Sequence, residues 1–136
     1  MKPISVVIVD SHEDLRRVLV RRLHSRADFV VVGDTASPLR GMELAAVRRP
    51  DLILFDAPTP GPYAAELCAR MVRASPESRL VVFTSFLDNE MEDAYERAGV
   101  ARCLVKEMGV AALAGELAAV ARGAQPVSHA GPGSSA

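Results

Sequence analysis

Four side chains that could do chemistry together stand where apolar runs of the sequence end. Asp10 ends "VVIVD" and Asp56 ends "DLILFD", whereas Thr84 lies in "VVFTS" and Lys106 closes "CLVK". Two neighbouring carboxylates bind a hard cation such as Mg²⁺, and a carboxylate held in this way can attack a phosphoryl group. An ammonium and a hydroxyl would then bind the phosphoryl oxygens. Each residue alone also fits a helix cap, a turn or a solvated charge, so the prediction depends on whether the fold brings them together.

The elements that must position these residues alternate between two hydrophobic periods. Uninterrupted β-branched runs predict buried strands, and apolar residues three and four apart predict amphipathic helices. Ser37 before Pro38 marks one helix start, and Ser11 with Asp14 marks another. The expected strands are Ile4–Val9, Phe29–Asp34, Pro50–Asp56, Arg79–Ser85 and Ala101–Lys106, and the expected helices run from Ser11 to near Arg26, from Pro38 to near Arg48, from Tyr63 to near Ala74, from Asn89 to Ala98 and over 109–123.

This alternation predicts an α/β fold, a doubly wound (βα)₅ arrangement with a parallel five-stranded sheet. Such a sheet has right-handed connections and helices on both faces. Its ligands bind outside the carboxyl ends of the strands. Because all four candidate residues stand at that end, we expect them to gather at one edge of the sheet although they are far apart in the sequence.

Composition limits the classes of protein that fit this chain. Its 136 residues suit one domain, and 16 Lys and Arg against 17 Asp and Glu give little support to direct nucleic-acid binding. No apolar run approaches the roughly 20 residues of a membrane span, and "MKPIS" is not a signal peptide. Cys68 and Cys103 lack metal-binding spacing, so we expect buried thiols, a cytoplasmic location and no membrane partner.

The last residues differ in composition from the rest of the chain. From Gly123 the sequence reads "GAQPVSHAGPGSSA", which offers little that could pack into a core. We therefore expect one domain over 1–123, followed by a flexible tail or the start of a linker over 124–136.

Taken together, the motifs resemble the receiver domain of bacterial two-component response regulators. The resemblance covers residues 3–122 and rests on "VVIVD", on "DLILFD" with Pro60 four residues after Asp56, on "VVFTS" and on "CLVK". It implies the flavodoxin-like strand order 2-1-3-4-5. The details are most similar to receivers whose usual output is a helix-turn-helix DNA-binding domain, which implies a role in transcription regulation.

The resemblance also implies a role for each candidate residue. Asp56 would accept a phosphoryl group from a histidine kinase, a phosphotransfer protein or a small phosphodonor. Asp10, Asp56 and the backbone carbonyl of Pro58 would bind Mg²⁺, whereas Thr84 would follow the phosphoryl group and Lys106 would be its cationic partner. The chain would not be an enzyme, beyond assisting the phosphorylation and dephosphorylation of its own aspartate.

The sequence departs from this pattern beside Asp10. Ser11 stands where the resemblance implies a second metal-binding acid, so Mg²⁺ should bind more weakly, at about 1.4 kcal/mol for each tenfold loss. Glu13 could supply a substitute carboxylate, but its place in the first helical turn favours a solvated side chain.

Other departures concern the residues that would transmit a signal. Cys103 stands three residues before the last strand's lysine, where the family's switch aromatic is expected, and Arg102 stands where many relatives carry glycine. In the loop after Asp56, Thr59 replaces the usual Met and Ala64 a common Gly. Three prolines stiffen this loop, which would limit its adjustment on phosphorylation.

Two functions of different classes therefore remain open. The retained acceptor, hydroxyl and lysine favour a phosphorylation switch with weak metal affinity. Ser11 and Cys103 favour an atypical receiver that acts as a phosphorylation-independent interaction or dimerisation module. A Mg²⁺-dependent phosphohydrolase is disfavoured because Pro58 stands where such enzymes carry a second Asp, and no GxGxxG turn supports dinucleotide binding.

The resemblance also implies an interaction surface, formed here by Asn89–Ala98, Arg102–Lys106 and Val110–Arg122. The start of this surface is acidic, through Asp88, Glu90, Glu92, Asp93 and Glu96. That charge fits either a solvated helix or a docking surface for a basic partner. A homodimer is a further possibility on the same grounds.

Overall fold

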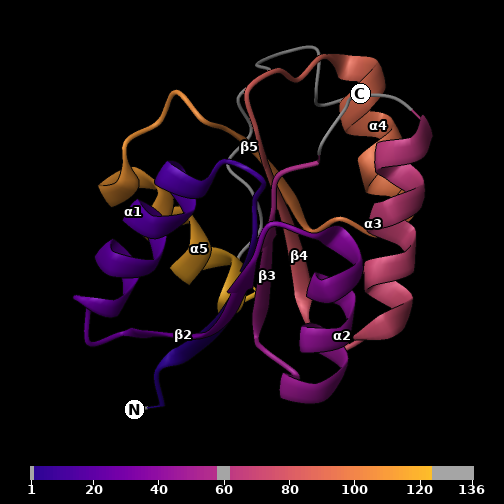
Figure 1. The fold of residues 1–136 in the computed structure, drawn as a ribbon. Helices are drawn as coiled ribbons and strands as arrows, with labels where there is room; N and C mark the ends of the chain where they lie inside the picture. Colours follow the sequence, from indigo (N-terminus) through magenta and orange to yellow (C-terminus); the bar gives the residue numbers. More distant parts are fainter. Residues whose placement is uncertain (1, 58–61, 124–136) are drawn as a thin grey trace.

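The computed structural model describes residues 2–57 and 62–123, which form one parallel sheet flanked by helices (Figure 1). Within these residues the sheet has five strands in the order β2-β1-β3-β4-β5. The expected α/β class and strand order are therefore confirmed. The strands are β1 (Ile4–Val9), β2 (Phe29–Thr35), β3 (Leu52–Phe55), β4 (Arg79–Thr84) and β5 (Arg102–Val105).

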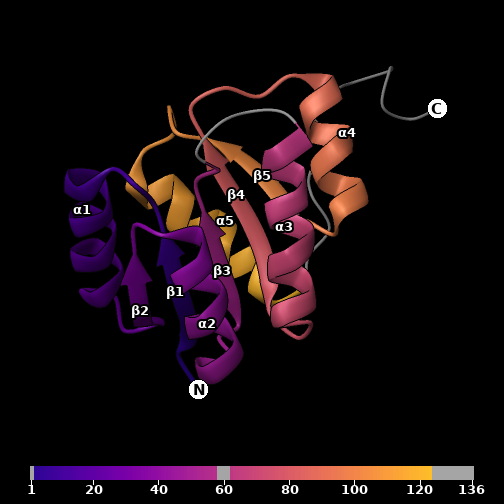
Figure 2. The same cartoon turned by 45° about the vertical axis from the view of Figure 1, so that its right-hand side comes forward.

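Helices cover both faces of the sheet, as the doubly wound arrangement requires. Helices α1 and α5 pack on one face, and α2, α3 and α4 pack on the other (Figures 1 and 2). Their bounds are α1 (Glu13–His24), α2 (Pro38–Arg48), α3 (Pro62–Ala74), α4 (Asn89–Ala98) and α5 (Val110–Ala121).

The central strand β1 shows why the apolar runs are uninterrupted. Val6 and Ile8 belong to the core cluster under α1 and α5, whereas Val7 and Val9 belong to the cluster under α2, α3 and α4. Successive side chains of a strand point to opposite faces, so a strand covered on both faces needs an apolar residue at every position. The polar residue that follows such a strand marks where it leaves the core.

A glycine lets α2 lie directly on the end of β1. A Cβ at Gly41 would stand 2.5 Å from Cγ2 of Val9, which is closer than packed carbon atoms approach. Glycine is therefore needed at this helical position despite its low helix propensity. The contact fixes the last residue of β1, immediately before Asp10.

The helix ends follow the expected capping rules in two places. Ser37 accepts a hydrogen bond from the N–H of Arg40, with Pro38 as the first residue of α2. Asp88 caps α4 in the same way through the N–H of Met91, and Gly99 ends that helix in the left-handed conformation with φ 104°. Several other strand ends differ from the expected bounds by one or two residues.

The expected start of α1 at Ser11 is wrong. The helix begins at Glu13, His12 is its N-cap without a side-chain cap, and Ser11 is exposed. The reason is that the Asp10 carboxylate accepts the backbone N–H of His12 at 2.8 Å, which turns the chain before the helix can begin. The helix also ends two residues earlier than expected.

None of the described helices is long and apolar enough to cross a membrane. The segment 124–136, expected to be a tail or linker, lies outside the described residues. The domain boundary at 123 therefore stays a prediction.

Candidate functional site

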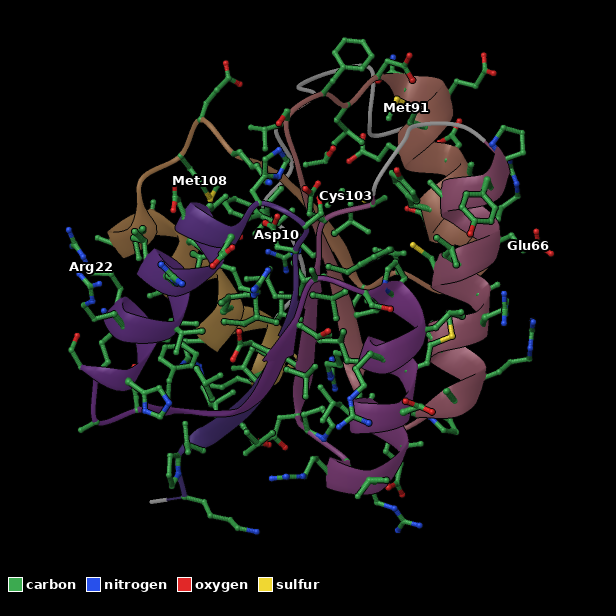
Figure 3. The ribbon with its side chains drawn as sticks, viewed as in Figure 1. Asp10, Arg22, Glu66, Met91, Cys103 and Met108 are labelled. Atoms are coloured by element: carbon green, nitrogen blue, oxygen red, sulfur yellow. The ribbon has the colours of Figure 1, made fainter. Side chains whose placement is uncertain are left out.

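Parallel pairing of β1 and β3 brings two acids to one edge of the sheet. Val9 pairs with Phe55, and the N–H of Asp56 donates to the Val9 carbonyl at 2.9 Å. Asp10 and Asp56 therefore leave neighbouring strands together, and they are only 2% and 9% exposed. Figure 3 shows Asp10 at the ends of the central strands. The fold thus buries two carboxylates where the sequence predicts a site.

Lys106 places its ammonium between these two carboxylates. The residue follows β5, and its backbone N–H donates to the Thr84 carbonyl at 2.8 Å. Its Nζ lies 2.9 Å from Oδ2 of Asp56 and 3.1 Å from Oδ2 of Asp10, with the side chain 13% exposed. The lysine therefore neutralises part of the charge that the two acids concentrate at this edge.

Thr84 reaches the same edge, but its hydroxyl bonds to the backbone. The residue ends β4 and is buried. Its Oγ1 donates to the carbonyl of Phe86 at 3.3 Å, a long hydrogen bond of modest strength. The structure thus brings Thr84 to the edge of the pocket with its hydroxyl engaged by the chain that leaves β4.

His12 is a member of the pocket that the sequence did not single out. Its Nδ1 lies 3.1 Å from Oδ1 of Asp10 and 3.2 Å from Oδ2 of Asp56. The side chain is 65% exposed, so no packing requirement explains its contact with two carboxylates from different strands. The available signal in the sequence was the position of His12 two residues after Asp10, next to a neutral Ser11 where an acid was expected.

The other residues of this loop do not supply the missing acid. Ser11 is exposed. Glu13 pairs with Arg17 on the next turn of α1, with Nη2 and Oε1 2.7 Å apart, and its side chain is 60% exposed. Glu13 is therefore solvated as expected, and the described part of the loop offers one carboxylate, from Asp10.

Arg16 holds the loop after β1 in place. Its Nη1 donates to the backbone carbonyl of Asp10 at 2.7 Å, and its Nε donates to Oδ2 of Asp34 in β2 at 3.0 Å. The N–H of Asp10 also donates to the Thr35 carbonyl at 3.0 Å. The backbone that carries Asp10 and His12 is therefore tied to the neighbouring strand.

Burial and charge act in opposite directions on Asp56. Removal of the carboxylate from water is the largest effect and raises the pKa of Asp56 above its ordinary value. The hydrogen bond and charge of Lys106 lower this pKa, Asp10 raises it, and His12 lowers it slightly. The net direction is a raised pKa, so a further cation in the pocket would favour the ionised form of Asp56.

The aromatic side chain beside β5 comes from α4. Cys103 packs against the core cluster that also contains Tyr95 of α4, which is 2% exposed. Burial raises the pKa of the Cys103 thiol and of the Tyr95 phenol to about 12 each. The Tyr95 hydroxyl has no hydrogen-bond partner among the described residues. Cys103, a small residue on β5, thus packs against the same cluster as the buried ring of Tyr95 on α4.

Some predicted residues cannot be placed in this pocket. Pro58, whose carbonyl was expected to bind a metal, lies outside the described residues together with Thr59 and Pro60. Ala64 is buried in α3, in the core cluster under that helix. Arg102 of β5 pairs with Glu116 of α5, with Nη1 and Oε1 2.6 Å apart.

The pocket has a donor set that fits a divalent cation. Asp10, His12 and Asp56 each offer one ligand atom, and these atoms all lie within 4.8 Å of one another. Mg²⁺ commonly binds through one or two carboxylates and keeps several waters, so the two acids meet its minimum requirement. An imidazole is a better ligand for transition metals than for Mg²⁺.

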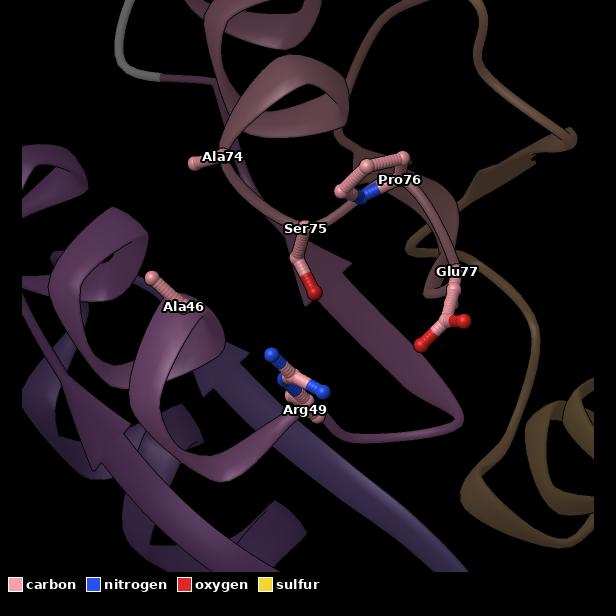
Figure 4. Close-up of a pocket in the computed structure, with 6 residues that line it drawn as sticks. All are labelled: Ala46, Arg49, Ala74, Ser75, Pro76 and Glu77. Atoms are coloured by element: carbon pink, nitrogen blue, oxygen red, sulfur yellow. The ribbon is translucent and has the colours of Figure 1, made fainter.

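A cavity at the opposite edge of the sheet lacks comparable chemistry. It has a volume of about 260 Å³ and is lined by Ala46, Arg49, Ala74, Ser75, Pro76 and Glu77 (Figure 4). The buried Ser75 hydroxyl bonds to Ser78, which in turn donates to the Pro50 carbonyl. Its buried hydroxyls are therefore satisfied, and its charged residues are exposed.

Comparison with known proteins identifies a family pattern along most of the chain. Residues 6–118 match the family described as the response regulator receiver domain. The transcriptional regulatory protein LiaR of Bacillus subtilis is 29% identical over 120 residues, which are 88% of this chain and 57% of LiaR. The transcriptional activator DevR/DosR of Mycobacterium tuberculosis is 33% identical over 106 residues, 77% of this chain and 48% of that protein. The chain spans about half the length of these relatives.

Solved structures share the fold. A LuxR-family two-component response regulator from Aurantimonas sp. SI85-9A1 superposes with a TM-score of 0.82 at 22% identity, over 94% of this chain and 91% of that one. The response regulator domain of Thermotoga maritima CheB superposes with a TM-score of 0.74 at 25% identity, over 93% and 99% of the two chains.

Proposed function

Because this chain belongs to the response regulator receiver domain family, whose function is to accept a phosphoryl group on an aspartate, we propose that Asp56 is its phosphoacceptor. The observation that carries the proposal is the contact of Lys106 Nζ with Oδ2 of Asp56 at 2.9 Å, beside a second buried acid. A buried carboxylate held by an ammonium at a strand end is poised to become an acyl phosphate.

The chemistry of the proposed step is a displacement at phosphorus. A carboxylate oxygen of Asp56 forms a new O–P bond, while the bond from phosphorus to the donor breaks and its electron pair stays on the donor atom. Lys106 neutralises charge that spreads over the phosphoryl oxygens. Thr84 would exchange its long bond to the Phe86 carbonyl for one to a phosphoryl oxygen, which would shift the start of the segment leading to α4.

Receiver domains bind Mg²⁺ at an acidic pocket, and this chain has an acidic cluster at the corresponding edge. We propose that Asp10 and Asp56 hold the cation, with the Pro58 carbonyl as a further ligand, and that binding is weak because Ser11 carries no charge. The cation would neutralise the phosphoryl oxygens during transfer. The domain itself would only assist its own phosphorylation and dephosphorylation, since receiver domains are not enzymes in the ordinary sense.

The proposed donor is a histidine kinase or a phosphotransfer protein, which are the partners of receiver domains. A homodimer and a role in transcription regulation are proposed from the curated relatives, which are transcription regulators about twice as long. The acidic start of α4 would suit a basic partner surface. Both cysteines are free, which supports the proposal of a reducing, cytoplasmic location.

A second candidate function rests on specific residues. Ser11 would weaken the metal site because it carries no charge, and Cys103 has no aromatic ring to move inward when Asp56 is phosphorylated. Both residues favour a receiver that serves as a phosphorylation-independent interaction module. The buried Asp56–Lys106 pair would then have only a structural role.

Incubation of the chain with a small acyl phosphate and Mg²⁺, followed by intact-mass measurement, separates the two functions. We expect a gain of one phosphoryl group that disappears in Asp56→Asn and persists in Asp93→Asn, a matched change of an exposed aspartate on α4. No gain at millimolar Mg²⁺ would favour the interaction module instead.

A further inference from the structure

The contacts of His12 constrain the state of its ring. Nδ1 faces Oδ1 of Asp10 at 3.1 Å and Oδ2 of Asp56 at 3.2 Å, and Lys106 Nζ lies 3.5 Å from it. A nitrogen lone pair pointing at two carboxylate oxygens would be repelled by both. The geometry therefore favours a cation close to Nδ1 and the two oxygens, and the Lys106 ammonium already lies on one side of this group of atoms.

The same distances suit ligands of one metal ion. Two ligand atoms at about 2.1 Å from a cation lie about 3.0 Å apart in octahedral geometry and about 3.4 Å apart in tetrahedral geometry. The two N···O distances at His12 fall between these values. A cation could therefore bind Nδ1 and either carboxylate oxygen with little movement of the ring, and the ligand atoms of all three residues lie within 4.8 Å of one another.

The two oxygens of Asp10 face different partners. Oδ1 faces the imidazole and accepts the backbone N–H of His12, whereas Oδ2 contacts Lys106 Nζ at 3.1 Å. Asp10 can thus contribute to a cation on the His12 side while its other oxygen stays with the lysine. The backbone N–H···Oδ1 bond also fixes the His12 backbone beside the acid, which orients the ligand in advance.

We propose that His12 is the third protein ligand of the cation pocket, and that it moves the preference of this pocket away from Mg²⁺ towards divalent transition metals that bind imidazole. The inference rests on the cation pocket of the proposed function, which supplies Asp10 and Asp56. It assigns to His12 the place in the ligand set that a carboxylate at position 11 would otherwise fill. Imidazole and carboxylate together suit Zn²⁺ and its neighbours, whereas Mg²⁺ prefers oxygen.

Equilibrium binding of Zn²⁺ and Mg²⁺ to the 136-residue chain tests this proposal. Zn²⁺ would be measured by competition with a chromophoric chelator, and Mg²⁺ by titration monitored by NMR, both near neutral pH. Zn²⁺ binds more tightly than Mg²⁺ at almost any site with nitrogen and oxygen ligands, so the informative quantity is the change in this preference caused by His12→Ala.

We expect His12→Ala to weaken Zn²⁺ binding about tenfold or more and to change Mg²⁺ binding by less than about threefold. The matched control is His24→Ala, which removes an exposed imidazole at the far end of α1 and should leave both affinities unchanged. The buried Cys68 and the half-buried Cys103 are poor competing ligands because burial raises the pKa of each thiol to about 12.

Ring ¹⁵N NMR of histidine provides a second readout that does not depend on affinity. Zn²⁺ should shift the Nδ1 resonance of His12 and leave the ring resonances of His24 in place. Unchanged Zn²⁺ affinity in His12→Ala, an equal loss of Zn²⁺ and Mg²⁺, or a Zn²⁺-insensitive His12 ring would each overturn the proposal.

These measurements are independent of phosphoryl transfer. A chain that binds Zn²⁺ through His12 but gains no phosphoryl group on Asp56 would support this inference and contradict the proposed function. A chain that is phosphorylated on Asp56 with the same Zn²⁺ affinity in His12→Ala would do the reverse.

Discussion

The two sides of the pocket differ in how closely they keep the receiver pattern. The side formed by β3, β4 and β5 contributes Asp56, Thr84 and Lys106, all largely buried and fixed by strand pairing. The side formed by the loop after β1 keeps Asp10, but its Ser11 is exposed to solvent. It also adds His12, whose side chain is 65% exposed. The difference shows that the loop side can change while the strand side keeps its pattern, because Asp56 and Thr84 are buried at strand ends whereas Ser11 and His12 are exposed.

This contrast has an energetic basis. A change at Asp56 or Lys106 alters a buried ion pair, so it affects folding as well as chemistry. A change at Ser11 or His12 alters exposed side chains, which contribute little to stability. Substitutions of Ser11 and His12 should therefore act on ligand affinity alone, whereas substitutions on the strand side should act on both affinity and stability.

Removal of the lysine should have the largest effect and tests the strand side. Lys106→Gln leaves two buried carboxylates without their ammonium, so we expect phosphorylation to slow about a hundredfold. The free energy of unfolding should also fall by about 2 to 3 kcal/mol near neutral pH. The rate of mass gain and urea unfolding measure the two effects.

The chain offers a matched control for this experiment. Lys2 is the other lysine of the chain and is exposed, so Lys2→Gln should change neither quantity. Normal phosphorylation of Lys106→Gln would show that the strand side does not depend on its cation.

Introduction of an acid at position 11 should bring the loop side of the pocket closer to the receiver pattern. Ser11→Asp adds a carboxylate beside Asp10, so we expect Mg²⁺ affinity to rise about tenfold, or about 1.4 kcal/mol. Titration of Mg²⁺ monitored by NMR measures the gain. Ser25→Asp, at the end of α1, controls for added negative charge. Equal Mg²⁺ affinity in both variants would mean that Ser11 is not at the metal site.

The strand side could be predicted from the sequence for a physical reason. Strands buried on both faces need uninterrupted apolar runs, so the first polar residue after each run marks the sheet edge. Asp56, Thr84 and Lys106 were found in this way, as was Asp10 on the loop side, and the structure places the Lys106 ammonium in contact with both acids. The orientation of the Thr84 hydroxyl depends on a side-chain rotation and a local backbone carbonyl, which no periodic pattern encodes.

The loop side could not be predicted in the same way. An exposed polar residue in a short turn belongs to no hydrophobic period, so only its position two residues after Asp10 distinguished His12 from other surface residues. The expected helix start at Ser11 also placed His12 inside the first turn. In the structure the Asp10 carboxylate binds the backbone N–H of His12, which delays the helix and leaves the ring beside the acids.

The pH dependence of stability should carry a signature of the strand side. Burial raises the pKa of Asp56 in the folded chain, so the folded state keeps this proton to higher pH than the unfolded state does. Stability from this group is therefore lost as pH rises from the ordinary carboxyl pKa through the raised folded pKa, and it is constant above that window. Asp56→Asn should thus gain stability relative to the unaltered chain as pH rises over that window.

Urea unfolding in the presence of a chelator, repeated across the acidic range, measures this difference. Asp93→Asn is the control, because its carboxyl is exposed on α4 and its difference from the unaltered chain should not follow the same window. A pH-independent difference for Asp56→Asn would show that Lys106 compensates fully for burial.

The smallest expected effect is that of Tyr95→Phe, which tests whether the strand side of the pocket includes a residue of α4. The Tyr95 hydroxyl is buried without a hydrogen-bond partner among the described residues, so Tyr95→Phe removes a desolvated polar group and keeps the ring. We expect the free energy of unfolding to rise by up to about 1 kcal/mol, with unchanged phosphorylation of Asp56. Tyr63→Phe is the control, because Tyr63 is 58% exposed and its hydroxyl is accessible to water. If urea unfolding instead shows a loss of stability, or if phosphorylation slows, the hydroxyl takes part in the pocket and the strand side extends into α4.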